Sequence, residues 1–210
     1  MANKRVKEER ARENERAKRQ TLIVNARRKF QPFALSAAIV SLVIMLLFFV
    51  DWAAVYNTDI RGNEVKISGF NTVFAAISGG YTKADKIYGN MAAPFFYYAA
   101  DWCKAIGVLT VAAFFVNILC LAASLTAYFT EYKRISALTL GCAAVLFALL
   151  LAIFFIALSM KDSRILPVYC GGNPKCSIRS AALLPAVVSA GCFALSLIGW
   201  IKYEKAMKKL

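Results

Sequence analysis

The segment Tyr169–Cys176 reads YCGGNPKC and places two cysteines six residues apart. Two thiols at this spacing could form a redox centre, half of a metal site or a structural disulfide. The Gly-Gly-Asn-Pro run between them is strong turn chemistry, so the chain can fold back and bring the two sulfurs together. We predict a Cys170–Cys176 disulfide. It closes a small loop, so its entropic stabilisation lies at the low end of the usual range, a few kcal/mol at most.

The other two uses of these thiols have less support in the sequence. A zinc site needs two further ligands, the chain contains no histidine, and Cys103 is the one other thiol expected on the same side. A quinone-linked four-helix thiol oxidase would carry a C-x-x-C pair, which the sequence lacks. A shuttle between Cys103 and either loop cysteine is therefore the remaining redox alternative. Cys120, Cys142 and Cys192 fall in apolar segments, where a free cysteine behaves as a small apolar residue.

The elements that must position these residues are membrane helices. Of the 210 residues, 60% are hydrophobic, and they are concentrated in four long blocks. Each block reaches the roughly 20 residues that a helix needs to cross about 30 Å of hydrocarbon. We predict an all-α integral membrane protein, a bundle of four transmembrane helices, with spans at 33–51, 105–130, 135–160 and 181–201.

The distribution of charge predicts the orientation of the bundle. The formal net charge is +14, and 17 of the 26 Lys and Arg residues fall in the segments on the side of the two termini. Excess Lys and Arg mark the cytoplasmic side, so both termini should lie inside a cell membrane. The charge then reflects topology and contact with an anionic inner leaflet, and nucleic acid is not an expected partner.

The predicted spans divide the rest of the chain into loops and tails. The first extracytoplasmic loop (52–104) contains NTDIRGNEVKISGF, whose Gly-Asn turn signal and alternating pattern predict a β-hairpin near 57–70. The second such loop covers 161–180. On the inner side we expect a charged arm, an amphipathic interfacial helix, a short turn and a basic tail, at 1–20, 21–32, 131–134 and 202–210.

The interfacial helix is predicted from the residues just before the first span. Apolar side chains between Leu22 and Phe33 recur at helical spacing, and Arg27, Arg28 and Lys29 lie on the opposite side. This pattern is typical of a helix that lies on an anionic leaflet, with its basic residues at the headgroups. Pro32 would then allow a bend into the first span.

Small residues form two lines at helical spacing within the spans. Such lines let helices approach closely, either within the chain's own bundle or at a seam with another subunit, and we expect both uses. The two lines are Ala137, Gly141, Ala144, Ala148 and Ala152 in the third span and Ala182, Ala186, Ala190 and Ala194 in the fourth. Asn117 is the one strongly polar side chain deep in a span, and we expect it to form an interhelical hydrogen bond.

The layout resembles that of claudin-like four-helix proteins. It shares a short cytoplasmic turn, a longer first outer loop with strand character and a shorter second outer loop. The resemblance is one of architecture, because the close pair of outer cysteines lies in the second loop. It implies the same four-helix arrangement, and no residue role is carried over.

These observations favour a non-catalytic membrane subunit, adaptor or scaffold. No catalytic motif, phosphate loop or intramembrane charge is present in the sequence, so we expect no enzyme activity and no cofactor or metal. The expected partner is another membrane protein, or a second copy of the chain in a homo-oligomer. Two alternatives remain: a transport or channel component with a pore formed in an oligomer, and a membrane thiol-redox protein that uses Cys170 and Cys176.

Overall fold

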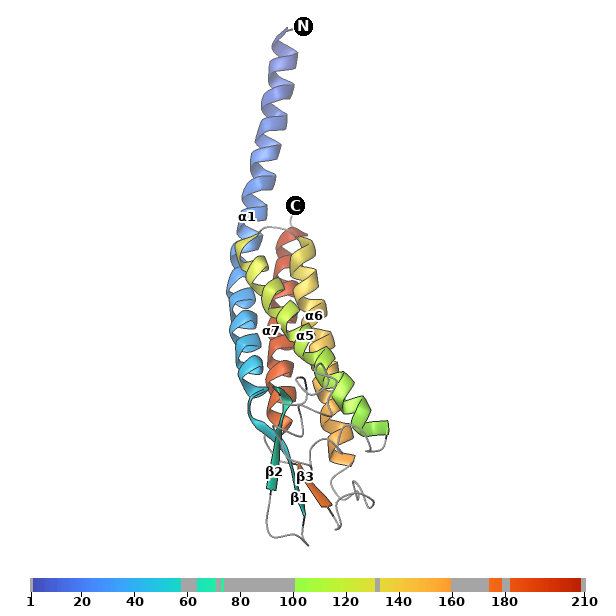
Figure 1. The fold of residues 1–210 in the computed structure, drawn as a ribbon. Helices are drawn as coiled ribbons and strands as arrows, with labels where there is room; N and C mark the ends of the chain where they lie inside the picture. The colour runs from blue at the N-terminus through green and yellow to red at the C-terminus, as the bar shows by residue number, and fades with distance from the viewer. Residues whose placement is uncertain are drawn as a thin grey trace.

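The computed structural model describes residues 2–57, 64–70, 73, 101–130, 133–159, 174–178 and 182–208 (Figure 1). Its helices are α1 (Ala2–Leu47), α5 (Asp101–Phe129), α6 (Lys133–Ser159) and α7 (Leu183–Met207). Its strands are β1 (Asp51–Asn57), β2 (Glu64–Ser68) and β3 (Pro174–Ile178).

All four helices are long and apolar enough to cross a membrane, and the chain is a multi-pass membrane protein. Their apolar stretches lie in Arg12–Leu47, Gly107–Phe129, Arg134–Ile156 and Leu183–Met207. Spans of this kind must be helical, because a helix satisfies its own backbone hydrogen bonds where no water is available. The four predicted spans therefore all fall on helices, although the helix of the first span begins far earlier than 33, at Ala2, and ends at Leu47.

The helices form an up-and-down bundle. Helix α1 packs against α5 and α7, and α6 packs against the same two helices from the other side. Each helix thus has two antiparallel neighbours, and α5 and α6 are joined by a short turn of the kind that favours this arrangement. Both termini lie at one end of the bundle, which we call the terminal end, and the strands lie at the other, the sheet end (Figure 1).

The predicted interfacial helix at 21–32 is not a separate element. Helix α1 continues through Pro32 without a break, from the charged arm into the bundle (Figure 1). Proline lacks the backbone N–H that a helix uses, so it tends to kink the helix at this point. Packing of the neighbouring residues against the rest of the bundle must therefore keep α1 continuous. Ala26 and Phe30 supply it, because both are buried in a cluster with Ala127 and Tyr203. Ala26 and Phe30, on this apolar face, therefore pack on the protein.

Three strands form a small sheet in the order β2-β1-β3. Strand β1 pairs antiparallel with β2, with Val55 opposite Val65, and antiparallel with β3, with Val55 opposite Cys176. The first strand begins earlier than the predicted hairpin, directly after the first span. The third strand was not predicted, and it joins the two segments that precede α5 and α7 into one sheet.

Aromatic packing fixes the sheet to the end of α1. The last turn tightens, with backbone bonds from Phe48 and its two successors to carbonyls three residues earlier. The Trp52 indole donates to the Leu47 carbonyl at 2.8 Å, and the Phe70 amide donates to the Phe48 carbonyl. These bonds satisfy carbonyls that a helix end leaves without partners. Gly69 lies under the rings, since a Cβ there would be 2.6 Å from Trp52 and 2.9 Å from Phe48.

Candidate functional site

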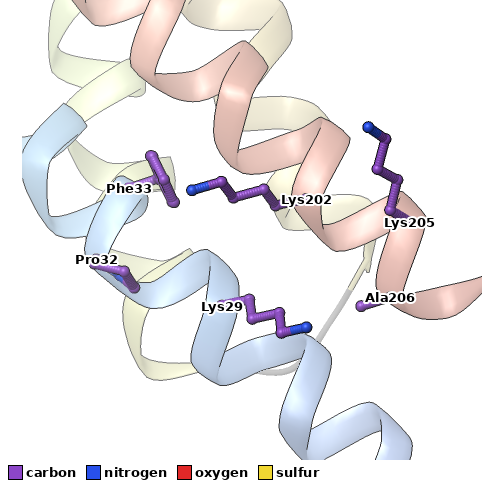
Figure 2. Close-up of a pocket in the computed structure, with 6 residues that line it drawn as sticks. All are labelled: Lys29, Pro32, Phe33, Lys202, Lys205 and Ala206. Carbon is purple, nitrogen blue, oxygen red and sulfur yellow. The ribbon is translucent and has the colours of Figure 1, made fainter.

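A pocket with three lysines lies between α1 and α7 at the terminal end of the bundle. It has a volume of about 640 Å³ and is lined by Lys29, Pro32, Phe33, Lys202, Lys205 and Ala206. Figure 2 shows the Lys202 side chain reaching from α7 towards Phe33, and the Lys29 side chain reaching from α1 towards Ala206. The pocket therefore combines an apolar wall with ammonium groups from two helices.

Gly199 lets the two helices approach closely enough to form this pocket. It is buried on α7, and a Cβ at this position would be 2.7 Å from the Cβ of Phe33 and 3.2 Å from the Phe30 ring. No side chain larger than hydrogen fits there without movement. One turn further along α7, the Lys202 ammonium lies 4.6 Å from the centroid of the Phe33 ring. This is within the range of a cation–π contact.

Further contacts hold α1 in place on both neighbours. The rings of Phe30 and Tyr203 meet edge to face with centroids 6.1 Å apart. On the other side, the Gln31 amide donates to the Tyr128 carbonyl at 3.2 Å, in the last turn of α5. The segment that carries Lys29 and Phe33 is thus fixed by apolar packing to α7 and by a polar contact to α5.

The basic residues predicted to contact the membrane surface divide between two surroundings. Lys29 lines the pocket, and Arg28 is exposed beside it on α1. The side chain of Arg27 lies outside the described part of the structure. Lys202 and Lys205, which the sequence placed only in a basic tail or at its edge, share the pocket with Lys29. No pattern in the sequence pairs these two segments, which lie about 170 residues apart along the chain.

A second polar feature lies in the centre of the bundle. Asn117 is fully buried, and its Nδ2 atom donates to the Ser41 carbonyl on α1 at 3.1 Å. This is an interhelical contact of the kind expected for Asn117. Its Oδ1 atom has no hydrogen-bond partner among the described residues. The amide is therefore half satisfied, and the unpaired oxygen offsets the benefit of the bond.

Two thiols lie beside this amide. Cys192 on α7 donates to the Ala37 carbonyl at 3.8 Å, and its sulfur is 3.9 Å from the Ser41 hydroxyl. Cys120 on α5 lies next to Cys192, so the pair meets across the diagonal of the bundle. Cys120 and Cys192 are free thiols in the structure, as is Cys142. They pack as small side chains with weak donors.

The other buried hydroxyls complete the central layer. Ser124 and Ser196 lie beside the Cys120 and Cys192 thiols, but neither oxygen has a partner with hydrogen-bond geometry in the described residues. This layer contains no carboxylate, imidazole or ammonium group among those residues. Within the same part of the chain, no cluster of three or more His, Cys, Asp or Glu side chains could hold a metal.

The line of small residues on α6 faces away from the bundle. Ala137, Gly141 and Ala148 are exposed, and Ala144 and Ala152 are half-buried. At about 100° per residue, the line lies opposite the face that α6 buries. The buried face consists of Ser136, Thr139, Ala143, Leu146, Leu150 and Ile153. A Cβ at Gly141 would have no neighbour within 4 Å.

The burial of the small residues on α7 changes along the helix. Ala186 is buried in the core, Ala182 and Ala190 are half-buried, and Ala194 is exposed. Residues at a strict spacing of four drift by about 40° per step around a helix, so such a line leaves the packed face. The close approach occurs at Gly199, beyond the end of the predicted line. Sequence reasoning missed it because a glycine on an inner face and one on an outer face look alike.

The predicted disulfide falls largely outside the described residues. Cys170 is not among them, and Cys176 lies in β3, where the backbone alone is described. Its pairing opposite Val55 on β1 places Cys176 in the sheet. The Cys170–Cys176 bond stays a prediction, as does any role of Cys103, whose side chain is also outside the described part.

Comparisons with protein-family models, with curated proteins and with solved structures find no match for this chain. The class of protein is therefore defined by the fold itself. The chain is a multi-pass membrane protein with a four-helix bundle and a small sheet at one end.

Proposed function

We propose that this chain is a non-catalytic subunit or scaffold of a larger assembly in the cytoplasmic membrane, with both termini inside the cell. The orientation is supported by the excess of Lys and Arg in the segments at the terminal end. A claudin-like layout, with a hairpin in the first outer loop, is supported by β1 and β2 pairing directly after the first span.

One observation carries the subunit proposal: a line of small residues runs along the outward face of α6, beside the exposed side chains of Leu138, Val145 and Phe155. Lipid tails are as apolar as leucine, so a surface that faces only lipid gains nothing from glycine and alanine. A second helix gains close backbone contact and dispersion from them. The chain's own bundle does not use this face, since a Cβ at Gly141 would meet nothing within 4 Å and Ala148 is exposed. A helix of another membrane protein, or of a second copy, fits it.

The test is isolation of the full chain from native membranes in mild detergent, followed by mass spectrometry and a size measurement. A stoichiometric partner or a defined homo-oligomer is expected. Gly141→Leu and Ala148→Leu together would fill the outward face of α6 and should release the partner while the bundle stays folded.

Gly191→Leu on α7 is the matched control. A Cβ at Gly191 also meets nothing within 4 Å, so the same change of side chain is tolerated by the bundle. It lies on another helix and should leave the assembly intact. Recovery of a lone monomer from native membranes, or equal loss of the partner in both variants, would refute a seam on α6.

A further inference from the structure

The pocket between α1 and α7 has the charge of an anion site. Lys29, Lys202 and Lys205 line it, and no ion pair joins a carboxylate to any of the three among the described residues. Lys29 and Lys202 bring two positive charges to this cavity from two helices, and Figure 2 shows the Lys205 ammonium pointing away from both. Their positions on separate turns and separate helices suit a compact anion with several acceptor oxygens, such as a phosphate.

The pocket also lies at the depth of a lipid headgroup. Trp200 lies two residues before Lys202 on α7, and Tyr128 lies at the same end of α5, and both side chains are half-buried. Tryptophan and tyrosine gather where hydrocarbon meets the headgroups, so the ammonium of Lys202 stands at that level. Basic pockets between transmembrane helices are a known mode of binding for anionic headgroups.

Apolar residues continue from the pocket into the bilayer. Pro32 and Phe33 form its wall, and the same sides of the two helices carry exposed Ile39, Val43 and Ile198 one to three turns deeper. An acyl chain attached to a phosphate in the pocket would follow this surface. A free phosphate ion would contact the lysines but would make no contact with the apolar wall.

We propose that this pocket binds the phosphate group of an anionic membrane lipid, with Lys29 and Lys202 as its principal contacts. The proposal does not depend on the subunit function, because it concerns the opposite side of the bundle from the outward face of α6. Close packing at Gly199 builds the site by setting the distance between the two lysine-bearing helices.

The experiment titrates the full chain in mild detergent with phosphatidylglycerol and, separately, with phosphatidylcholine of the same acyl chains. Retained lipid is counted by native mass spectrometry. Preferential binding of phosphatidylglycerol is expected. Each basic residue near an anionic surface changes the binding constant by about fivefold, so Lys29→Gln with Lys202→Gln should weaken lipid binding by about 25-fold.

Lys18→Gln with Lys208→Gln is the matched control. It removes the same charge from α1 and from the residue directly after α7, at positions that do not line the pocket. Binding within about twofold of the original chain is expected, and far-UV circular dichroism checks that both variants keep their helices. If both double variants weakened phosphatidylglycerol binding equally, the lipid would be held by the overall positive charge and not by the pocket, and the proposal would be overturned. Equal binding of the two lipids, or displacement by inorganic phosphate at matched concentration, would overturn it too.

Discussion

The Cβ atom of Phe33 on α1 lies 2.7 Å from the point that a Cβ atom would occupy at Gly199 on α7. This approach joins the first and last helices of the chain at the terminal end, where the lysines gather. Gly199→Ala should lower the free energy of unfolding by about 1–3 kcal/mol, because an added methyl in a tight contact forces the neighbours to move. Unfolding in mixed detergent, followed by far-UV circular dichroism, measures the change.

Gly141→Ala provides the comparison for that prediction. It makes the same change of side chain on α6, where a Cβ meets nothing within 4 Å. There it should stabilise the helix by about 0.5–1 kcal/mol, because glycine in a helix interior has excess freedom in the unfolded chain. If Gly199→Ala and Gly141→Ala changed the free energy of unfolding in the same direction, the close packing described at Gly199 would be contradicted.

Asn117→Leu should leave the protein at least as stable as the original chain. The substitution removes the bond to the Ser41 carbonyl, and interhelical bonds in membranes average about 0.6 kcal/mol. It also removes the unpaired Oδ1 atom, and a buried unsatisfied acceptor costs about 1–3 kcal/mol. The same unfolding measurement applies, with Ser124→Ala as a smaller change of the same kind. A loss above about 2 kcal/mol for Asn117→Leu would mean that the oxygen has a partner.

Trp52→Phe should weaken the attachment of the sheet to α1. Phenylalanine keeps the ring contact with Phe48, whose centroid is 5.0 Å away, but it cannot donate to the Leu47 carbonyl. The expected loss is about 1 kcal/mol, with faster hydrogen exchange in β1. Gly69→Ala should have a larger effect, because its methyl would overlap both rings. Unchanged exchange in both variants would refute this attachment.

The Cys170–Cys176 disulfide should be found by digestion without reductant and mass spectrometry of protein taken from membranes. Cys176→Ser should then lower stability by a few kcal/mol at most, since the closed loop is short. Cys142→Ala serves as the control, because that thiol is free in the structure. Reduced Cys170 and Cys176 in freshly isolated protein would contradict the prediction.

The helices could be predicted because about 20 apolar residues have few other stable arrangements in a bilayer. It is harder to predict which side of each helix faces the bundle, because membrane helices are apolar on all sides. The line from Ala137 to Ala152 favoured packing inside the bundle, with a seam for another subunit as the alternative, and the structure places the line outside. Gly199 carries a close contact of α7 with α1, whereas a Cβ at Gly191 on the same helix would meet nothing within 4 Å.

Pro32 and β3 show two other limits of sequence reasoning. A proline before a span is compatible with a bend, and the packing that keeps α1 straight comes from Tyr203, far along the chain. Strand β3 is five residues long and depends on pairing with β1, so its own sequence carries little signal. The pocket likewise requires the contact between the first and last helices before its lysines come together.

The unbroken course of α1 separates the basic residues of its arm into two electrostatic groups. The arm continues beyond the bundle from Asn25 back to Ala2 as a single helix (Figure 1). At 1.5 Å per residue, these 24 or so residues extend about 36 Å from the end of the bundle. The Debye length at physiological ionic strength is about 8 Å, so charges near the tip lie several screening lengths from the lipid surface. In the proposed orientation, the basic residues around Arg28 and Lys29 are nearest the leaflet, and those near Ala2 are available to charged groups in the surrounding solution.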